Sequence, residues 1–263
     1  MLFRNNLKSL PWILFLCLLT GNTMVYGSES YQNPYLVNRI PESNQRYGSL
    51  DLVLRLLELQ QAKTLVETGT AREGLKNFEG DGGSTIIFGE WADKHNGSFY
   101  SVDLSPQSIA SAQEAVNQMK LSSHLVCSDS IAFLTDFGKP IDFLYLDSFD
   151  YDWYNPVPCQ EHHLKEVIAA YPWLHNNSII MIDDCSLPHG GKGKLAIKYL
   201  EEHGWTTIYS AYQVVLLYSK RNLTHQFQLE KPNKPAVENA QVPATKHAQA
   251  PTTGNTQAWI TPR

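Results

Sequence analysis

The sequence has little of what defines several common protein classes. Only four of its 263 residues are cysteine, scattered and without a CxxC pair, so neither a disulfide scaffold nor a CxxC metal site is predicted. An excess of basic residues is also missing. With 21 Lys+Arg, 26 Asp+Glu and a net charge of −5, the composition does not support nucleic-acid binding. Its 16 glycines and 14 prolines exclude a collagen-like repeat, and 43% hydrophobic residues exclude a wholly disordered chain. A globular protein of one large or two small domains remains.

The first 27 residues have the pattern of a secretory signal peptide. Arg4 and Lys8 precede an apolar run from Leu10 to Leu19, and small and polar residues continue to Gly27. As a helix this run would be about 15 Å long, too short to span roughly 30 Å of hydrocarbon. We expect cleavage after Gly27 and an exported protein, periplasmic or secreted. An uncleaved membrane anchor is the alternative.

The C-terminal segment 223–263 is rich in Pro, Ala, Thr and Gln and shows no apolar period. Such a composition cannot bury enough apolar surface to offset the chain entropy, so we expect a disordered tail. The predicted organisation is a signal peptide or anchor, an N-terminal extension, a folded domain and this tail, at residues 1–27, 28–47, 48–222 and 223–263.

Between the two ends, apolar strand-like runs alternate with helix-like segments. The runs are KTLVETGT, SFYSVDL, HLVCSDS, IDFLYLDSF and SIIMIDD, and WTTIYSAYQVVLLYSK adds two β-rich runs around Ala211. Uninterrupted apolar strands are typical of a parallel sheet covered on both faces. The pattern predicts an α/β fold: a Rossmann-like, doubly wound, mostly parallel sheet with helices on both faces and a C-terminal antiparallel β-hairpin.

Polar residues gather where these predicted strands end. They are Glu67, Thr68, Gly69, Thr70, Asp103, Ser128, Asp129, Asp147, Asp183 and Asp184. Ligands of such sheets bind outside the carboxyl ends of the strands. Each acid alone is explained by a helix cap or a solvated turn. Together they indicate a binding site, because carboxylates near a core are costly unless they are satisfied.

The order and spacing of these segments resemble those of a known enzyme class. VETGTAREG, GDGGST at 80–85, SVD, LD and IDD resemble the motifs of class I S-adenosylmethionine-dependent methyltransferases, and more narrowly of the macrocin-type O-methyltransferase subgroup. The resemblance covers roughly residues 48–220. It implies S-adenosylmethionine as cofactor, held by Glu67, Thr68, Gly69, Thr70, Ser84, Asp103, Ser128 and Asp129.

The residue types at these positions suit that cofactor. Gly69 has no Cβ, so the backbone can turn tightly and approach a ligand closely. Glu67 can accept a hydrogen bond from the ammonium end of the cofactor or position it through the turn. The resemblance assigns the ribose hydroxyls to Asp103 and the adenine contact to Ser128 and Asp129. The alternative is that Asp103 and Asp129 are helix N-caps.

Two other nucleotide-binding interpretations fit less well. The GxGxxG of dinucleotide folds is missing, because GTAREG lacks the first two-glycine spacing. GGKGKLA at 190–196 lacks the upstream glycine and the hydroxyl of a P-loop, so its glycines are expected to shape a loop beside the site. The insert LKNFEGDGG also departs from the compact loop of most methyltransferases, and it leaves roles between residues 71 and 83 open.

Three further acids, Asp147, Asp183 and Asp184, follow the fourth and fifth strands, which we expect to be neighbours. Converging carboxylates repel one another unless a cation or protons intervene, and oxygen ligands suit Mg²⁺. Catechol-type O-methyltransferases look similar here, which implies that these residues bind Mg²⁺ and that the metal lowers the pKa of the acceptor hydroxyl. The alternative is that Asp183 caps a turn and Asp184 is solvated.

The catalytic residues are predicted to be Asp147 and Asp150. Asp150 lies three residues beyond Asp147, where relatives often place a histidine or lysine, and it could take the proton of the acceptor. An exposed loop acid is the alternative. His162 and His163 are adjacent, so on a helix they would point about 100° apart. We expect both at the surface, with one of them facing the cleft as the alternative.

The resulting hypothesis is an S-adenosylmethionine-dependent O-methyltransferase, assisted by Mg²⁺, that acts on a sugar or another small-molecule hydroxyl. No nucleic-acid partner is expected, a membrane partner is expected only for an uncleaved anchor, and a homo-oligomer stays open. The export signal conflicts with a cofactor made in the cytosol, so the alternative is an exported Rossmann-like binding or interaction module. A hydroxylase is less favoured, because the sequence lacks a convincing His-x-Asp metal triad.

Overall fold

The computed structural model describes residues 32–80 and 83–219. The predicted signal peptide and C-terminal tail lie outside these ranges, so both stay predictions. Among the described residues, no helix has the length and apolar content needed to cross a membrane.

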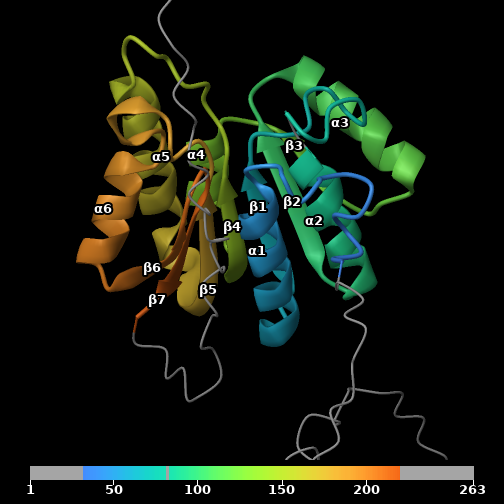
Figure 1. The fold of residues 1–263 in the computed structure, drawn as a ribbon, viewed down its shortest axis with the longest axis horizontal. Helices are drawn as coiled ribbons and strands as arrows, with labels where there is room; N and C mark the ends of the chain where they lie inside the picture. Colours follow the sequence, from blue (N-terminus) through green and yellow to red (C-terminus); the bar gives the residue numbers. More distant parts are fainter. Residues whose placement is uncertain (1–31, 81–82, 220–263) are drawn as a thin grey trace, which may run out of the picture. The chain divides into compact units, whose positions relative to one another are not determined.

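Strands and helices alternate through the described ranges (Figure 1). The strands are β1 (Thr64–Thr68), β2 (Ser98–Asp103), β3 (His124–Cys127), β4 (Ile141–Leu146), β5 (Leu174–Ile182), β6 (Trp205–Ser210) and β7 (Val214–Tyr218). The α-helices are α1 (Tyr47–Gln60), α2 (Gly83–Lys94), α3 (Pro106–Met119), α4 (Ser130–Thr135), α5 (Val157–Ala170) and α6 (Lys194–Glu202). Two 3₁₀ helices are η2 (Tyr171–Trp173) and η3 (Pro188–Gly190).

Within these ranges the strands form one seven-stranded sheet, in the order β3-β2-β1-β4-β5-β7-β6. The first five strands pair in parallel, and β7 runs antiparallel to both β5 and β6. The order reverses direction between β1 and β4, which is where open α/β sheets bind their ligands. The predicted fold class is confirmed, including the antiparallel C-terminal hairpin.

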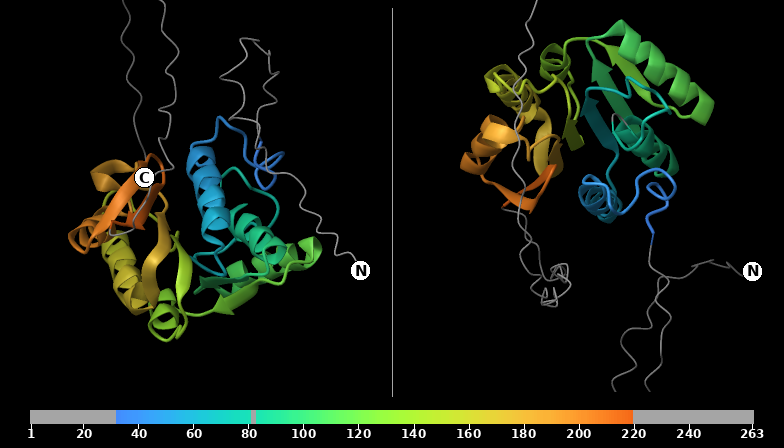
Figure 2. Two further views of the ribbon diagram at one scale, coloured as in Figure 1. Left: turned by 90° about the horizontal axis from the view of Figure 1, so that it is seen from below. Right: turned by 45° about the horizontal axis from the view of Figure 1, so that its top comes forward.

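Each face of the sheet has its own apolar core. Along β4, Phe143 and Tyr145 pack with α1 and α2, whereas Leu144 and Leu146 pack with α4, α5 and α6. Successive side chains of a strand point to opposite faces, so a run that is apolar throughout can feed both cores. Figures 1 and 2 show the resulting three layers, with α1 and α2 on one side of the sheet and α5 and α6 on the other.

The described part of the N-terminal extension packs on the domain. Leu36 and Ile40 are buried in the same core as α1. The Asn33 side chain accepts the backbone N–H of Tyr35 at 3.1 Å and donates to Asp51 at 3.0 Å. This packing carries the chain to Arg46, directly before α1.

Candidate functional site

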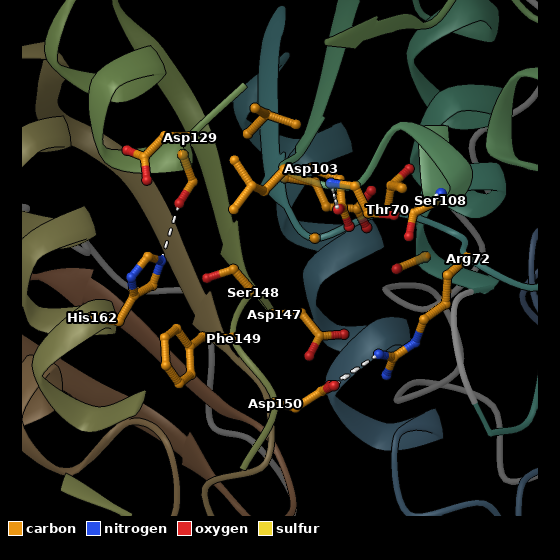
Figure 3. Close-up of a pocket in the computed structure, with 17 residues that line it drawn as sticks. Thr70, Arg72, Asp103, Ser108, Asp129, Asp147, Ser148, Phe149, Asp150 and His162 are labelled. Carbon is orange, nitrogen blue, oxygen red and sulfur yellow. Dashed lines mark hydrogen bonds and ion pairs between the residues drawn. The ribbon is translucent and has the colours of Figure 1, made fainter. Parts of the chain in front are cut away.

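A cavity of about 300 Å³ opens at the carboxyl ends of the parallel strands (Figure 3). Among the residues predicted for the cofactor, those that line it are Glu67, Gly69, Thr70, Ser84, Asp103 and Asp129. The other two lie elsewhere: Thr68 is fully buried in β1, and Ser128 lines a neighbouring pocket beside Tyr100. Most of the predicted set is therefore brought together, at the predicted edge of the sheet.

The turn after β1 depends on Gly69. This residue has a φ of +84°, and a Cβ atom there would lie 2.6 Å from the carbonyl oxygen of Asp147. Any other residue would be strained and would clash with the backbone after β4. Glycine is thus required by the contact between two loops of the site, whatever ligand the cavity holds.

Glu67 stabilises the same turn through hydrogen bonds. Its side chain is buried, and its Oε2 accepts hydrogen bonds from the hydroxyls of Thr85 and Ser101, both at 2.7 Å. The Thr85 hydroxyl in turn accepts the backbone N–H of Ala71 at 2.9 Å. Burial raises the pKa of Glu67 to about 7, although the hydroxyl hydrogen bonds oppose the shift. Glu67 therefore positions the turn through its neighbours.

Asp103 ends β2 and faces the cavity. Its Oδ1 accepts the backbone N–H of Ser105 at 2.7 Å, whereas the N-cap of α3 is Ser105 itself, whose hydroxyl accepts from Ser108. The helix-cap alternative for Asp103 is therefore wrong. A carboxylate can accept about four hydrogen bonds, so this single backbone contact leaves acceptor capacity for a ligand.

Asp129 lies on the opposite side of the cavity from Asp103 (Figure 3). It is the N-cap of α4, with its Oδ1 accepting the backbone N–H of Ala132 at 2.9 Å. The cap alternative is confirmed for this residue. A cap uses one carboxylate oxygen, so the adenine contact stays a prediction.

The expectation that His162 and His163 lie at the surface is wrong. His163 is fully buried, and His162 lines the cavity beside Phe149 (Figure 3). The Nε2 atom of His162 lies 3.1 Å from Ser130 Oγ and 3.3 Å from Glu166 Oε1. Burial alone would raise the pKa of Glu166, but the two histidines lower it to about 2. α5 thus contributes polar side chains to the wall of the cavity, and for His162 the alternative of a histidine that faces the cleft matches this position.

The three acids predicted to bind Mg²⁺ do converge. Asp147, Asp183 and Asp184 each place a carboxylate oxygen within 4.8 Å of the others. This follows from the pairing of β4 with β5, which brings the two strand ends side by side. Asp183 is fully buried, Asp184 is partly buried, and only Asp147 also lines the cavity.

Two cations of the protein already pair with these acids. Lys192 Nζ lies 3.1 Å from Asp147 Oδ1 and 3.0 Å from Asp184 Oδ2, and its side chain is 4% exposed. Arg46 donates from Nε and Nη2 to Asp183 Oδ2, at 3.2 and 3.0 Å. Each of the three carboxylates therefore faces a side-chain cation.

Burial and the neighbouring charges shift the pKa values of these acids in opposite directions. Burial and the negative charge of Asp183 raise the pKa of Asp147 well above its usual value. Burial acts the same way on Asp184, but Lys192 and the Tyr212 hydroxyl outweigh it and lower the pKa of Asp184. Burial would lower the pKa of Lys192, but the acids around it raise it, so Lys192 is an ammonium ion at neutral pH.

This arrangement does not fit a divalent metal ion, although the donor atoms are of the right kind. Mg²⁺ takes carboxylate oxygens at about 2.0–2.1 Å. The space between Asp147 and Asp184 is already bridged by the Lys192 ammonium, and Arg46 holds Asp183. An ion bound by these acids would have to displace Lys192. The predicted Mg²⁺ site stays a prediction.

Asp150 lies at the rim of the cavity, with its side chain 78% exposed. Its carboxylate pairs with Arg72, whose Nη1 lies 2.9 and 3.2 Å from the two oxygens (Figure 3). The alternative of an exposed loop acid matches this position. Its catalytic role stays a prediction.

Arg46 and Lys192 are two site residues that the sequence did not reveal. Arg46 pairs with an acid 137 positions away, so no local pattern marks it. Lys192 does carry a signal: it stands between glycines in GGKGKLA, a segment expected only to shape a loop.

Part of the chain matches a known protein family. Residues 79–185, from the loop before α2 to the end of β5, match the model of a family described as a methyltransferase domain. No curated protein matches the chain significantly.

Solved structures with a similar fold include three proteins. NSun6 from Pyrococcus horikoshii with SFG has 15% identity and a TM-score of 0.50, over 65% of this chain and 52% of that chain. The SAH-bound methyltransferase PaMTH1 from Podospora anserina has 12% identity and a TM-score of 0.49, over 65% of this chain and 77% of that chain. A Staphylococcus aureus protein described as a caffeoyl-CoA O-methyltransferase has 15% identity and a TM-score of 0.48, over 64% of this chain and 81% of that chain. The similarity spans about half the length of NSun6. At these identities it concerns the fold alone.

The sheet order and the antiparallel β6–β7 hairpin define a Rossmann-like methyltransferase fold. The match of residues 79–185 to a methyltransferase-domain family agrees with this fold. The predicted fold is confirmed, and the family match over residues 79–185 agrees with the predicted class. The macrocin-type subgroup stays a prediction.

Proposed function

We propose that the protein transfers a methyl group from S-adenosylmethionine to a hydroxyl oxygen of a small molecule. The observation that carries the proposal is the cavity at the strand ends, where Gly69, Asp103 and Asp129 meet around a space of about 300 Å³. The family match and the fold support the methyl-transfer part of this proposal.

The cofactor would extend across this cavity. Asp103 offers its carboxylate to the ribose hydroxyls, as acids at the end of the second strand do in related nucleotide folds. Asp129 and His162 lie on the opposite wall, where the adenine would fall. Thr70 and Ser84 line the end nearest the start of α2, and a helix N-terminus favours the carboxylate of the amino-acid part.

The acceptor would lie beside Asp147, because this acid alone belongs both to the cavity and to the acid cluster. The acceptor oxygen attacks the methyl carbon, the carbon–sulfur bond breaks, and the sulfonium leaves as a neutral thioether. Asp147 takes the hydroxyl proton in this proposal, since Asp150 is exposed and paired with Arg72. The domain's main contribution is to hold oxygen, carbon and sulfur in line.

Binding of the cofactor by the full chain tests the proposal. Isothermal titration calorimetry should detect both S-adenosylmethionine and S-adenosylhomocysteine. Asp103→Asn should weaken both roughly 10- to 100-fold, because a charged hydrogen bond to the ribose contributes about 1.5–3 kcal/mol. Glu114→Gln, an exposed acid on the following helix, is the matched control. If neither ligand binds, the exported binding module becomes the better explanation.

We also propose that the N-terminal segment exports the protein and that the acceptor is a sugar or another small molecule. The basic, apolar and small-residue order of residues 1–27 supports export, and the net charge of −5 favours a partner other than nucleic acid. Fractionation of cells expressing the full chain should give a shortened, non-cytosolic product. A full-length cytosolic product would contradict cleavage after Gly27.

A further inference from the structure

The Lys192 ammonium occupies the centre of the acid cluster. It lies at 3.1 and 3.0 Å from oxygens of Asp147 and Asp184, which come from the ends of two neighbouring strands. The side chain is nearly inaccessible to solvent, so the contact is an internal ion pair and not a surface one. In the catechol-type enzymes that this region resembles, acids at the same strand ends hold a metal ion.

The loop that carries Lys192 is shaped to insert it. Gly191 has a φ of +59°, and a Cβ there would lie 2.0 Å from the carbonyl oxygen of Asp184. A Cβ at Gly193 would lie 2.6 Å from Cys185 Sγ, and Gln160 Nε2 donates to the Gly191 carbonyl at 3.0 Å. Glycines on both sides therefore let the backbone approach closely enough for the lysine to reach the acids. The backbone of this loop therefore lies against the end of β5, from where the Lys192 side chain reaches the acids.

The protein itself supplies the cations of this site. Lys192 and Arg46 place two positive charges against the three acids. A divalent ion in the same space would face the nearly buried Lys192 ammonium at short range, where like charges repel. An ion could bind the acids only if the lysine left.

We propose that Lys192 is the resident cation of this site in place of a divalent metal. It is a positioning residue that holds the Asp147 carboxylate toward the acceptor, and the site binds neither Mg²⁺ nor Mn²⁺. The part of this inference that concerns methyl transfer rests on the proposed function. The part that concerns metal binding does not.

Manganese binding, followed by the loss of the free Mn²⁺ signal in electron paramagnetic resonance, tests the metal part without any turnover. The wild-type full chain and the matched control Lys194→Met, an exposed lysine two residues away, should leave the signal unchanged at millimolar Mn²⁺. Lys192→Met should bind Mn²⁺ at least tenfold more tightly, because it exposes three carboxylates. Stoichiometric binding by the wild type that Asp184→Asn abolishes would overturn the proposal.

A second measurement decides the matter if Lys192→Met does not fold, as judged by circular dichroism. A ligand that binds only the folded state raises the melting temperature. The melting temperature of the wild type should therefore be the same in Mg²⁺ and in EDTA, and a rise in Mg²⁺ that Asp184→Asn removes would contradict the proposal.

Calorimetry on the same samples separates this inference from the proposed function. If S-adenosylhomocysteine fails to bind, the proposed function fails while the Mn²⁺ result still stands. If S-adenosylhomocysteine binds and EDTA does not affect methyl transfer by the wild type, the proposed function and the inference about Lys192 are both supported. Mg²⁺ should then partly restore the activity that Lys192→Met loses, a rescue that a purely structural lysine would not show.

Discussion

Two groups of acids lie at the same edge of the sheet and differ in what they face. Asp103 and Asp129, after β2 and β3, line the cavity and, in the described part of the chain, hydrogen bond to backbone N–H groups at one oxygen each. Asp183 and Asp184, after β5, do not line the cavity and are paired with Arg46 and Lys192. The first group keeps acceptor capacity for a ligand, and the second is satisfied within the protein.

This contrast shows that position at a strand end is not enough to assign a role. Carboxylates near a core need partners, and the partner decides whether the group can bind a ligand. Asp147 lies between the two groups, since it lines the cavity and also pairs with Lys192. It links cofactor binding to the acid cluster.

The largest effect is expected from removing the charge that compensates Asp183. Arg46→Met leaves a fully buried carboxylate without its cation and should lower the free energy of unfolding by about 3–5 kcal/mol. Arg55→Met is the matched control, because Arg55 is half exposed and pairs with Asp51 on the helix surface, where about 1 kcal/mol or less is expected. Urea denaturation measures both. Equal losses of unfolding free energy in the two variants would show that the buried pair of Arg46 with Asp183 stabilises the protein no more than the surface pair of Arg55 with Asp51 does.

The second prediction concerns the pH dependence that Glu67 imposes. Its pKa is about 7 in the folded protein and 4.5 as the reference for the unfolded chain, so the folded state binds the proton more tightly. The contribution of Glu67 to stability should therefore be greatest below about pH 4.5 and be lost as the pH rises through about 7. The difference amounts to about 3 kcal/mol at most.

Glu67→Gln isolates this term, because the amide keeps the shape and can still accept from Thr85 and Ser101. Denaturation of both proteins between pH 4.5 and 7.5 should show a difference that grows with pH, in favour of the variant. A constant difference would mean that the folded-state pKa of Glu67 is not raised.

The third prediction separates the two roles of Asp129. Asn caps helices as well as Asp does, so Asp129→Asn should change stability by only a few tenths of a kcal/mol, whereas Asp129→Ala should lose about 1 kcal/mol. If the carboxylate also contacts the adenine, both variants should weaken binding of S-adenosylhomocysteine several-fold in calorimetry. Unchanged affinity in Asp129→Asn would leave this residue as a cap alone.

Sequence patterns predicted the fold because its determinants are local. Runs such as IDFLYLDSF are apolar at every position, and β4 uses alternate residues for the two cores. The strand-end acids are visible for the same reason, since each follows its own strand directly. Gly69 was also found, although its tightest contact is with the Asp147 backbone and not with a ligand.

The pairing of charges could not be predicted in this way. Arg46 and Asp183 meet only because the segment before α1 packs against the end of β5, a contact that depends on the whole fold. The position of His162 could not be predicted for a related reason. Adjacent residues on α5 face different surroundings, and the sequence does not reveal which face of the helix meets the cavity.

The smallest effect is expected at Asp150, the predicted catalytic acid that the structure leaves most exposed. Its pair with Arg72 is a surface ion pair, so Asp150→Asn should change stability by no more than about 0.5 kcal/mol. Methyl transfer to a hydroxyl acceptor should fall less than threefold, whereas Asp147→Asn should lower it at least tenfold, because only Asp147 links the cavity to the acid cluster. Rates measured with radiolabelled cofactor compare the two variants. A large loss of methyl-transfer rate in Asp150→Asn alone would identify Asp150, at the rim of the cavity, as the base. The pairing of an acid with a buried cation would then not indicate which acid takes the proton.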